Sequence, residues 1–307
     1  MLLNVKSYVE RQKKDLKEKI DVLVEKPVLS IISLEEDAAS QSYMKNKLRL
    51  AEELGIYACV QQLNINALAY DELDAALSSL KDSICDGIII QIPANRKLDD
   101  EVFTKDKKSF SYRECISKYI DKAKDVDGLS LSSAADLYAA TSSNKSTLRY
   151  LQSGTVPCTA AGIVNYLTHL FKEHLSGKDV VIAGRSDLVG KPLSLLLTGL
   201  DCTVTLCHSK TQNLREKIKS ADIVVSAIGK PHFFDRTYFK DGQTLIDVGI
   251  SRVDNHLVGD IDKLGLENKR IYYTPVPGGV GLLTTLQLMT NVYLAAAKKS
   301  INQAVTI

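Results

Sequence analysis

A tyrosine and a lysine stand four residues apart in a segment with the apolar spacing of a helix, residues 38–54. At that spacing Tyr43 and Lys47 project from the same face of the predicted helix. A lysine can act as a general acid or base when burial or a neighbouring cation lowers its pKa toward neutrality. All five histidines lie after residue 168, so acid-base chemistry before that point must use Lys, Asp, Glu, Tyr or Cys. The alternative is an exposed pair on a polar helix.

Two further strings place polar groups at the ends of predicted elements. Gln91 lies in the apolar run GIIIQIP (87–93), where its amide either contacts a ligand at the strand end or is satisfied by neighbouring backbone. The string KDVDGLS places Asp125 and Asp127 around a turn at Gly128. Such turns are common, and the rest of a calcium loop is missing. The residues alone leave both interpretations open.

The predicted strand DVVIAG (179–184) leads directly into the turn GRSDLVGKP (184–192). Gly184 opens this turn, Gly190 permits close backbone approach, and the N-terminus of the following helix can bind a phosphate. The spacing matches neither the Walker A loop nor G-x-G-x-x-G. A tight connection without any ligand is an equally good interpretation.

The next predicted strand, CTVTLC (202–207), is not followed by the acidic residue that binds the ribose of NAD. His208, Ser209 and Lys210 follow it instead. With Arg185 and Ser186 they can offer donors and positive charge to a 2′-phosphate. We therefore predict NADP rather than NAD, the alternative being a solvated loop with incidental basic residues.

Short β-rich runs alternate with helical stretches in two series, which predicts an α/β protein with parallel strands. The second series, after residue 150, has the pattern of a doubly wound nucleotide-binding sheet. The polar segment 140–147 therefore indicates a domain boundary near residue 150. The charged stretch 95–121 is expected to be a mobile excursion with one short helix. The loop TPVPGGVG (274–281) is either a rigid ligand loop or a plain hinge.

Composition narrows the possible partners. The 39 basic and 37 acidic residues leave a net charge of +2, without the basic, aromatic-rich stripe of a nucleic-acid groove. Six cysteines have no C-x-x-C spacing and no histidines at ligand intervals, which indicates reduced thiols and no metal site. We see no apolar run long enough to span a bilayer, so we expect a cytoplasmic protein with a small-molecule substrate.

Taken together, the motifs resemble the bifunctional methylenetetrahydrofolate dehydrogenase/methenyltetrahydrofolate cyclohydrolase family. Nine strings occur in family order across nearly the whole chain: DAASQSYMKNK, DGIIIQIP, KDVDG, PCTAAGI, GRSDLVGKP, VTLCHSKT, IDVGI, GDID and TPVPGGVG. The resemblance implies two α/β domains flanking a cleft, the second a Rossmann-like doubly wound parallel sheet. It implies a folate-binding catalytic domain at 1–150, joined by the C-terminal helix 283–307, and an NADP domain at 151–282.

The resemblance also assigns roles by position. Lys47 resembles the family's essential lysine, Tyr43 the aromatic residue that stacks on the folate, and Gln91 the glutamine bonded to that lysine. Asp127 resembles the carboxylate that anchors the pterin ring. The remaining assignments are NADP contacts at Gly184, Arg185, Ser186, Ser209 and Ile250, and a cleft-lining loop at Gly278, Gly279 and Val280.

The implied function is NADP-dependent oxidation of 5,10-methylenetetrahydrofolate followed by hydrolysis of the methenyl product to 10-formyltetrahydrofolate. A homodimer is implied as well, and the apolar segment 222–250 offers a possible surface. The chain departs from the family pattern in DGLSLSSAAD (127–136), at Ala160 and at Leu282. These departures keep two alternatives open: an NADP-dependent dehydrogenase without hydrolysis, and a non-catalytic NADP sensor.

Overall fold

The computed structural model describes residues 1–34, 38–93, 96–254 and 256–305, with 38–40, 42, 43 and 301–305 described in backbone only. The described chain forms two compact units. The three-stranded unit comprises Lys13–Asp136, Leu151–Cys158 and Leu288–Ile307, and the five-stranded unit comprises Met1–Gln12, Leu137–Tyr150 and Thr159–Gln287. The folate and NADP domains predicted from the sequence were assigned by function, whereas these two units are defined by their compactness. The predicted domain ranges therefore stay predictions.

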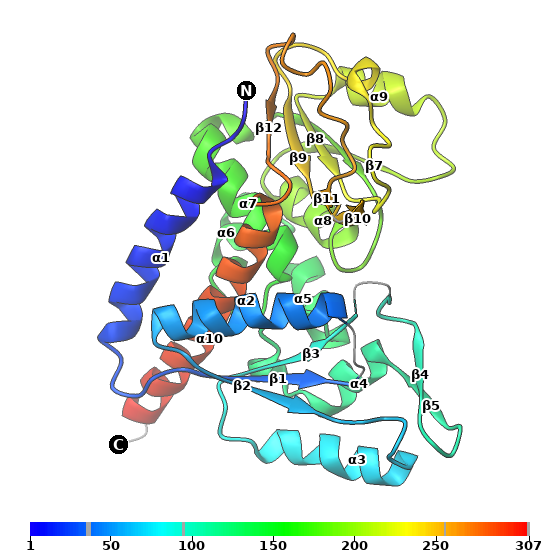
Figure 1. Cartoon of the computed structure of the whole chain (residues 1–307). Coiled ribbons are helices and arrows are strands. Elements are labelled where there is room, and N and C mark those ends of the chain that lie inside the picture. Colours follow the sequence, from blue (N-terminus) through cyan, green and yellow to red (C-terminus); the bar gives the residue numbers. More distant parts are fainter. Residues whose placement is uncertain (35–37, 94–95, 255, 306–307) are drawn as a thin grey trace. The chain divides into compact units, whose positions relative to one another are not determined.

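The three-stranded unit is built on a parallel sheet in the order β2-β1-β3. Its strands are β1 (Val28–Ser33), β2 (Tyr57–Gln62) and β3 (Gly87–Gln91), and helices α2 (Ala38–Leu54) and α3 (Tyr70–Ser78) flank them (Figure 1). Ser33 at the end of β1 pairs in register with Gln91 at the end of β3. The carboxyl ends of these strands therefore meet at one edge of the sheet, which is where α/β proteins bind ligands.

The charged stretch 95–121, which the structure describes from residue 96 onward, contains more secondary structure than was predicted. It forms a β-hairpin of β4 (Glu101–Phe103) and β5 (Ser109–Ser111), followed by α4 (Tyr112–Tyr119). Val102 and Phe110 are buried, and Ser111 accepts a hydrogen bond from the Glu114 N–H at 3.2 Å as the cap of α4. The predicted short helix is present as α4, but the β-hairpin was not predicted, because single buried apolar residues anchor an otherwise polar segment.

The five-stranded unit contains a parallel sheet in the order β12-β9-β8-β6-β7. Its strands are β6 (Asp179–Ala183), β7 (Thr203–Cys207), β8 (Ile223–Ser226), β9 (Thr244–Asp247) and β12 (Tyr272–Tyr273). The chain reverses its direction of winding between β6 and β8, so a doubly wound sheet is confirmed, and the crevice beyond these strands is the expected ligand position. The remaining strands form a hairpin, β10 (Ser251–Val253) and β11 (His256–Val258).

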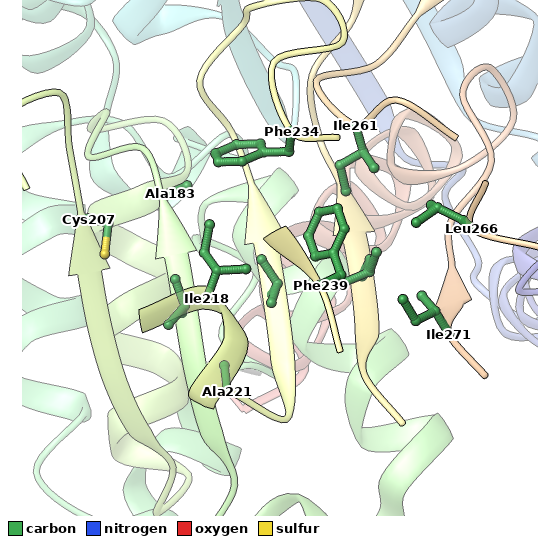
Figure 2. Close-up of a cluster of buried hydrophobic side chains, with 12 residues drawn as sticks. Ala183, Cys207, Ile218, Ala221, Phe234, Phe239, Ile261, Leu266 and Ile271 are labelled. Atoms are coloured by element: carbon green, nitrogen blue, oxygen red, sulfur yellow. The ribbon is translucent and has the colours of Figure 1, made fainter. Parts of the chain in front are cut away.

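Apolar side chains from strands, helix and loops pack on one face of this sheet (Figure 2). Val181 and Val224 come from the strands, Ile218 from α9 (Leu214–Ser220), and Phe234 and Phe239 from the segment after β8. Val180, Ile182 and Ile246, their neighbours along the strands, are buried as well. Burial of both faces explains why these strands are nearly continuous runs of Val and Ile. It also means that strands β8 and β9, inside 222–250, are core elements rather than a surface for a partner.

The remaining helices connect or cover the sheets: α1 (Val5–Asp21), α5 (Leu131–Ala140), α6 (Asn144–Tyr150), α7 (Cys158–Phe171), α8 (Gly190–Gly199), α9 (Leu214–Ser220) and α10 (Val280–Val305). Short 3-10 turns lie at Ser79–Asp82, Lys122–Lys124, Lys172–Leu175 and Arg236–Tyr238. The polar segment 140–147, which was predicted to mark a domain boundary, runs from the end of α5 into the start of α6.

The sequence was expected to contain no apolar run long enough to span a bilayer, but helix α10 contains one. Its segment Val280–Ser300 is long and apolar enough to cross a bilayer by length and composition. Half of that segment is nevertheless buried inside the protein, including Leu283, Met289 and Val292. Burial of this kind is typical of a core helix.

Candidate active site

A lysine and a glutamine meet at the edge of the three-stranded sheet. Lys47 is presented by α2, Gln91 ends β3, and Lys47 Nζ donates a hydrogen bond to Gln91 Oε1 at 2.8 Å. The Gln91 amide is held in this orientation because its Nε2 donates to the Ile92 carbonyl oxygen at 2.9 Å. The predicted proximity of the two side chains is present. The Lys47 side chain is half-buried, and its hydrogen-bond partner is the uncharged amide of Gln91.

Asp127 and Cys158 complete the electrostatic surroundings of this lysine. Burial lowers the pKa of Lys47, and the Asp127 carboxylate and the Cys158 thiol oppose that effect. Burial likewise raises the pKa of Asp127, which the Lys47 ammonium opposes. The pKa of Cys158 lies well above its usual value because of burial and the neighbouring Asp127. The balance favours a lysine that can lose its proton more readily than one in water.

Asp125, two residues before Asp127, has a structural role. Its buried carboxylate accepts hydrogen bonds from the Leu129 and Ser130 N–H groups at 3.2 and 2.9 Å, and from Ser133 Oγ at 2.6 Å. These bonds organise the start of α5, in the segment where the chain departs from the family pattern. Gly128 adopts φ +68°, and a Cβ there would lie 2.6 Å from the Pro157 nitrogen. Only glycine fits the turn that carries Asp127.

Tyr43 lies in the backbone of α2, one turn before Lys47, but its side chain is outside the described residues. Its stacking role stays a prediction.

The five-stranded unit places Gly184 and Gly190 at the carboxyl end of β6. Gly184 has φ +122°, and a Cβ there would collide with the carbonyl oxygen of Ala227, which follows β8. A Cβ on Gly190 would collide with the Gly184 carbonyl oxygen. The turn therefore needs glycine at both positions, because its backbone packs directly against the backbone after β8. This contact lies between β6 and β8, where the sheet reverses its direction of winding. At the start of α8, Ser186 Oγ accepts from the Val189 N–H at 3.2 Å and the Ser186 carbonyl oxygen accepts from the Lys191 N–H at 3.0 Å. The positive end of the α8 dipole lies at this turn.

Polar side chains surround the turn. Arg185 and Ser186 are exposed after β6, and Ser209 and Lys210 are exposed after β7. The loop after β7 is held from within, because Thr211 Oγ1 accepts from the His208 N–H at 2.9 Å and His208 Nδ1 accepts from the Lys210 N–H at 3.1 Å. The exposed serine and lysine are thus available to a ligand.

The other predicted contacts in this unit lie around the loop 274–281. Gly278 has φ +91° and open space where a Cβ would be, whereas a Cβ on Gly279 would collide with the Pro275 carbonyl oxygen. Val280, at the start of α10, is buried. The side chain of Ile250 is 38% exposed, and its Cδ1 lies 3.9 Å from the Cβ position of Gly281. The ligand roles of these four residues stay predictions.

Sequence reasoning missed two buried aspartates in the motifs IDVGI and GDID. Asp260 accepts hydrogen bonds from Ser226 Oγ and from the Ile228 and Lys230 N–H groups, each at 2.8 Å. Asp247 accepts from the Asp260 and Ile261 N–H groups at 3.0 and 3.1 Å. The pKa of Asp247 is raised to about 6, mainly by burial. These carboxylates fix the loops beyond β8 and β9. The available sequence signal was a glycine within two residues of each aspartate, Gly249 after Asp247 and Gly259 before Asp260.

Comparison with known proteins agrees with this arrangement. Residues 3–127 match the catalytic domain of tetrahydrofolate dehydrogenase/cyclohydrolase, and residues 157–300 match the NAD(P)-binding domain of the same enzyme. The bifunctional protein FolD of Maridesulfovibrio salexigens is 38% identical over 299 residues, covering 94% of this chain and 96% of the relative. That of Campylobacter concisus is 36% identical, covering 97% and 98%.

Solved structures give the same result. The bifunctional FolD methylenetetrahydrofolate dehydrogenase/cyclohydrolase of Campylobacter jejuni superposes with a TM-score of 0.83 and 32% identity, covering 97% of this chain and 99% of that one. The Trypanosoma brucei enzyme, solved with NADP cofactor and inhibitor, gives a TM-score of 0.82 at 28% identity, covering 98% of each chain. The chain therefore belongs to the tetrahydrofolate dehydrogenase/cyclohydrolase family.

Proposed function

We propose that this protein oxidises 5,10-methylenetetrahydrofolate to the 5,10-methenyl compound with NADP, and hydrolyses that product to 10-formyltetrahydrofolate. The observation that carries the proposal is the 2.8 Å bond between Lys47 and Gln91 beside the half-buried Asp127. Such a group can move protons during hydrolysis. Both family domains are present in one chain, and relatives of similar length carry the bifunctional name.

NADP, when bound, supplies the acceptor for the hydride. The turn after β6 fits a dinucleotide, since it combines side-chain-free backbone, a helix N-terminus and the winding reversal of the sheet. Gly184, Arg185, Ser186, Ser209 and Ile250 would hold the cofactor, with Arg185 and Lys210 offering charge to its 2′-phosphate. The enzyme's main task in this step is to align the two reactants.

The hydrolytic step needs proton transfer at two atoms. The oxygen of water bonds to the methenyl carbon and loses one proton. The bond between that carbon and N5 then breaks as the same oxygen loses its second proton and becomes the formyl carbonyl, while N5 gains a proton, so one proton is released overall. We assign this transfer to Lys47, whose ammonium nitrogen is oriented by Gln91 Oε1. Asp127 would anchor the pterin ring and Tyr43 would stack on the folate, with Gly278, Gly279 and Val280 lining the substrate side.

Separate assays of the two half-reactions test the proposal. Purified protein is mixed with 5,10-methylenetetrahydrofolate and NADP, then with NAD, and then with the methenyl compound alone. We expect NADPH formation, a weaker rate with NAD, and methenyl loss faster than spontaneous hydrolysis. Reduction without accelerated hydrolysis would support a dehydrogenase alone, and NADP binding without turnover would support the sensor.

We also propose a homodimer in a reducing, cytoplasmic setting. Val253 and Leu257, both exposed on the β10-β11 hairpin, offer apolar surface in the five-stranded unit. All six cysteines are free thiols, a state that suits a reducing compartment. Light scattering on the wild type and on Leu257→Asp tests the dimer, and cell fractionation tests the location.

A further inference from the structure

Asn291, in the middle of α10, joins two backbone segments of the three-stranded unit. It is fully buried, and its Nδ2 donates hydrogen bonds to the carbonyl oxygens of Val126 and Val156, each at 2.9 Å. The same nitrogen lies 3.5 Å from Cys158 Sγ. Val126 immediately precedes Asp127, and Val156 lies two residues before Cys158. One amide group therefore connects both segments that face Lys47.

These two segments are packed too closely for a substitute donor to enter easily. The Cβ position of Gly128 lies 2.6 Å from the carbonyl carbon of Val156, and Cys158 Sγ donates to the Val126 carbonyl oxygen at 3.3 Å. Two buried carbonyl dipoles thus converge on the Asn291 amide. If the Asn291 amide were removed, the Val126 and Val156 carbonyl oxygens would lose their buried hydrogen bonds. The two segments would then separate so that these oxygens could regain hydrogen-bond donors.

We propose that Asn291 is a positioning residue for the hydrolytic step, holding the Asp127 and Cys158 segments at their distance from Lys47. This inference rests on the proposed function. Asn291 would act through those segments rather than by touching the substrate. Asp127 and Cys158 are the titratable groups that act on Lys47, with Asp125 acting in turn on Asp127. Displacing the segments therefore changes both the rate and the protonation of the lysine.

The test compares Asn291→Leu, Asn291→Ser and Val292→Ala. Leucine removes both donors, whereas serine keeps one hydroxyl donor. Val292 is the next residue of α10 and is also buried, so its truncation weakens the same helix without removing a hydrogen bond. For each variant we would measure the melting temperature, methenyl hydrolysis against pH, NADP affinity, and the Lys47 titration by NMR of ¹³Cε-labelled lysine.

We expect Asn291→Leu to lower kcat/KM for hydrolysis by about tenfold or more. The titration midpoint of Lys47 should fall, because the lysine loses the nearby Asp127 carboxylate without gaining solvent. Asn291→Ser should lie between Asn291→Leu and the wild type. Val292→Ala should keep the wild-type midpoint and a hydrolysis rate within about twofold, since it changes stability but not the position of charge. NADP affinity should be the same in all three.

A positioning role is excluded if folded Asn291→Leu matches Val292→Ala in rate and Lys47 midpoint at a similar melting temperature. If the leucine variant does not fold, Asn291→Ser decides by the same comparison. A wild-type chain that binds NADP but does not hydrolyse the methenyl compound would refute the proposed function instead, and the Lys47 midpoint would still decide the role of Asn291.

Discussion

The two units form their candidate sites by different physical means. In the three-stranded unit, Lys47, Gln91 and Asp127 come from separate elements, and their chemistry depends on burial and on each other's charge. In the five-stranded unit, the glycine turn is defined by backbone that leaves no room for side chains, and the polar side chains around it are exposed. The first site should therefore be sensitive to changes of charge, and the second to added volume in its backbone.

Removing the lysine should produce the largest effect. We expect Lys47→Met to lower methenyl hydrolysis by about 10²–10⁴-fold, the usual contribution of a general acid or base. NADP affinity should be unchanged. Lys45→Met, which removes an exposed lysine from the same helix, should hydrolyse the methenyl compound at the wild-type rate. Near-normal hydrolysis by Lys47→Met would remove Lys47 from the mechanism.

Adding one methyl group to the glycine turn tests whether the site in the five-stranded unit is sensitive to added volume. Gly184→Ala places a Cβ against the Ala227 carbonyl oxygen at φ +122°, so we expect NADP affinity to fall on the order of 10–100-fold. Calorimetric titration with NADP measures the change. Gly177→Ala is the matched control, because Gly177 also has a positive φ, +76°, but no atom within 4 Å of its Cβ position. Equal losses in the two variants would mean that general strain, rather than the turn, weakens binding.

A charge placed beside the lysine should give an intermediate effect. Gln91→Glu puts a carboxylate where the amide oxygen now accepts from Lys47, so the ammonium form is stabilised and the pKa of Lys47 rises. The limb of the hydrolysis pH profile that reports deprotonation of Lys47 should move to higher pH. The rate at neutral pH should fall by about tenfold, because each pKa unit removes a factor of ten in the neutral amine. An unchanged profile would contradict the assignment of this limb to Lys47.

The smallest effect is expected at the exposed arginine. Arg185→Gln should weaken NADP binding by about fivefold and leave NAD binding unchanged, since an exposed ion pair contributes about 1 kcal/mol or less. Lys191→Gln removes a nearby charge that is already paired with Asp187 at 2.7 Å, and should alter neither affinity. Equal weakening of NADP and NAD by Arg185→Gln would contradict recognition of the 2′-phosphate.

The sequence predicted elements best where apolar periodicity is continuous. The helix expected at 38–54 has those bounds in the structure, and the predicted strands differ from the observed ones only at their ends. The β4-β5 hairpin was missed because it rests on isolated buried residues such as Val102 and Phe110. The S-x-x-E spacing of Ser111 and Glu114 did mark the start of α4 and could have been used.

The candidate site was only partly predictable. The position of Gln91 at the end of a parallel strand predicted that it could contact a ligand. Its contact with Lys47 could be predicted only from the family resemblance, because no local pattern links residues 44 positions apart. Asn291 could not be found from local patterns, since its amide bonds to carbonyl groups 165 and 135 residues away along the chain. Long-range partners of buried polar groups are determined by tertiary packing, and a single sequence carries no periodic signal for them.

The ionisation of Lys47 itself is the most direct test of its proposed role in proton transfer. NMR titration of protein labelled with ¹³Cε-lysine, with the Lys47 signal assigned from its loss in Lys47→Met, measures its pKa in the folded chain. We predict a value below the ordinary 10.5, because burial outweighs the opposing charge of Asp127. A value at or above 10.5 would mean that the ion pair dominates, and Lys47 would then be a fixed positive charge rather than the group that exchanges protons.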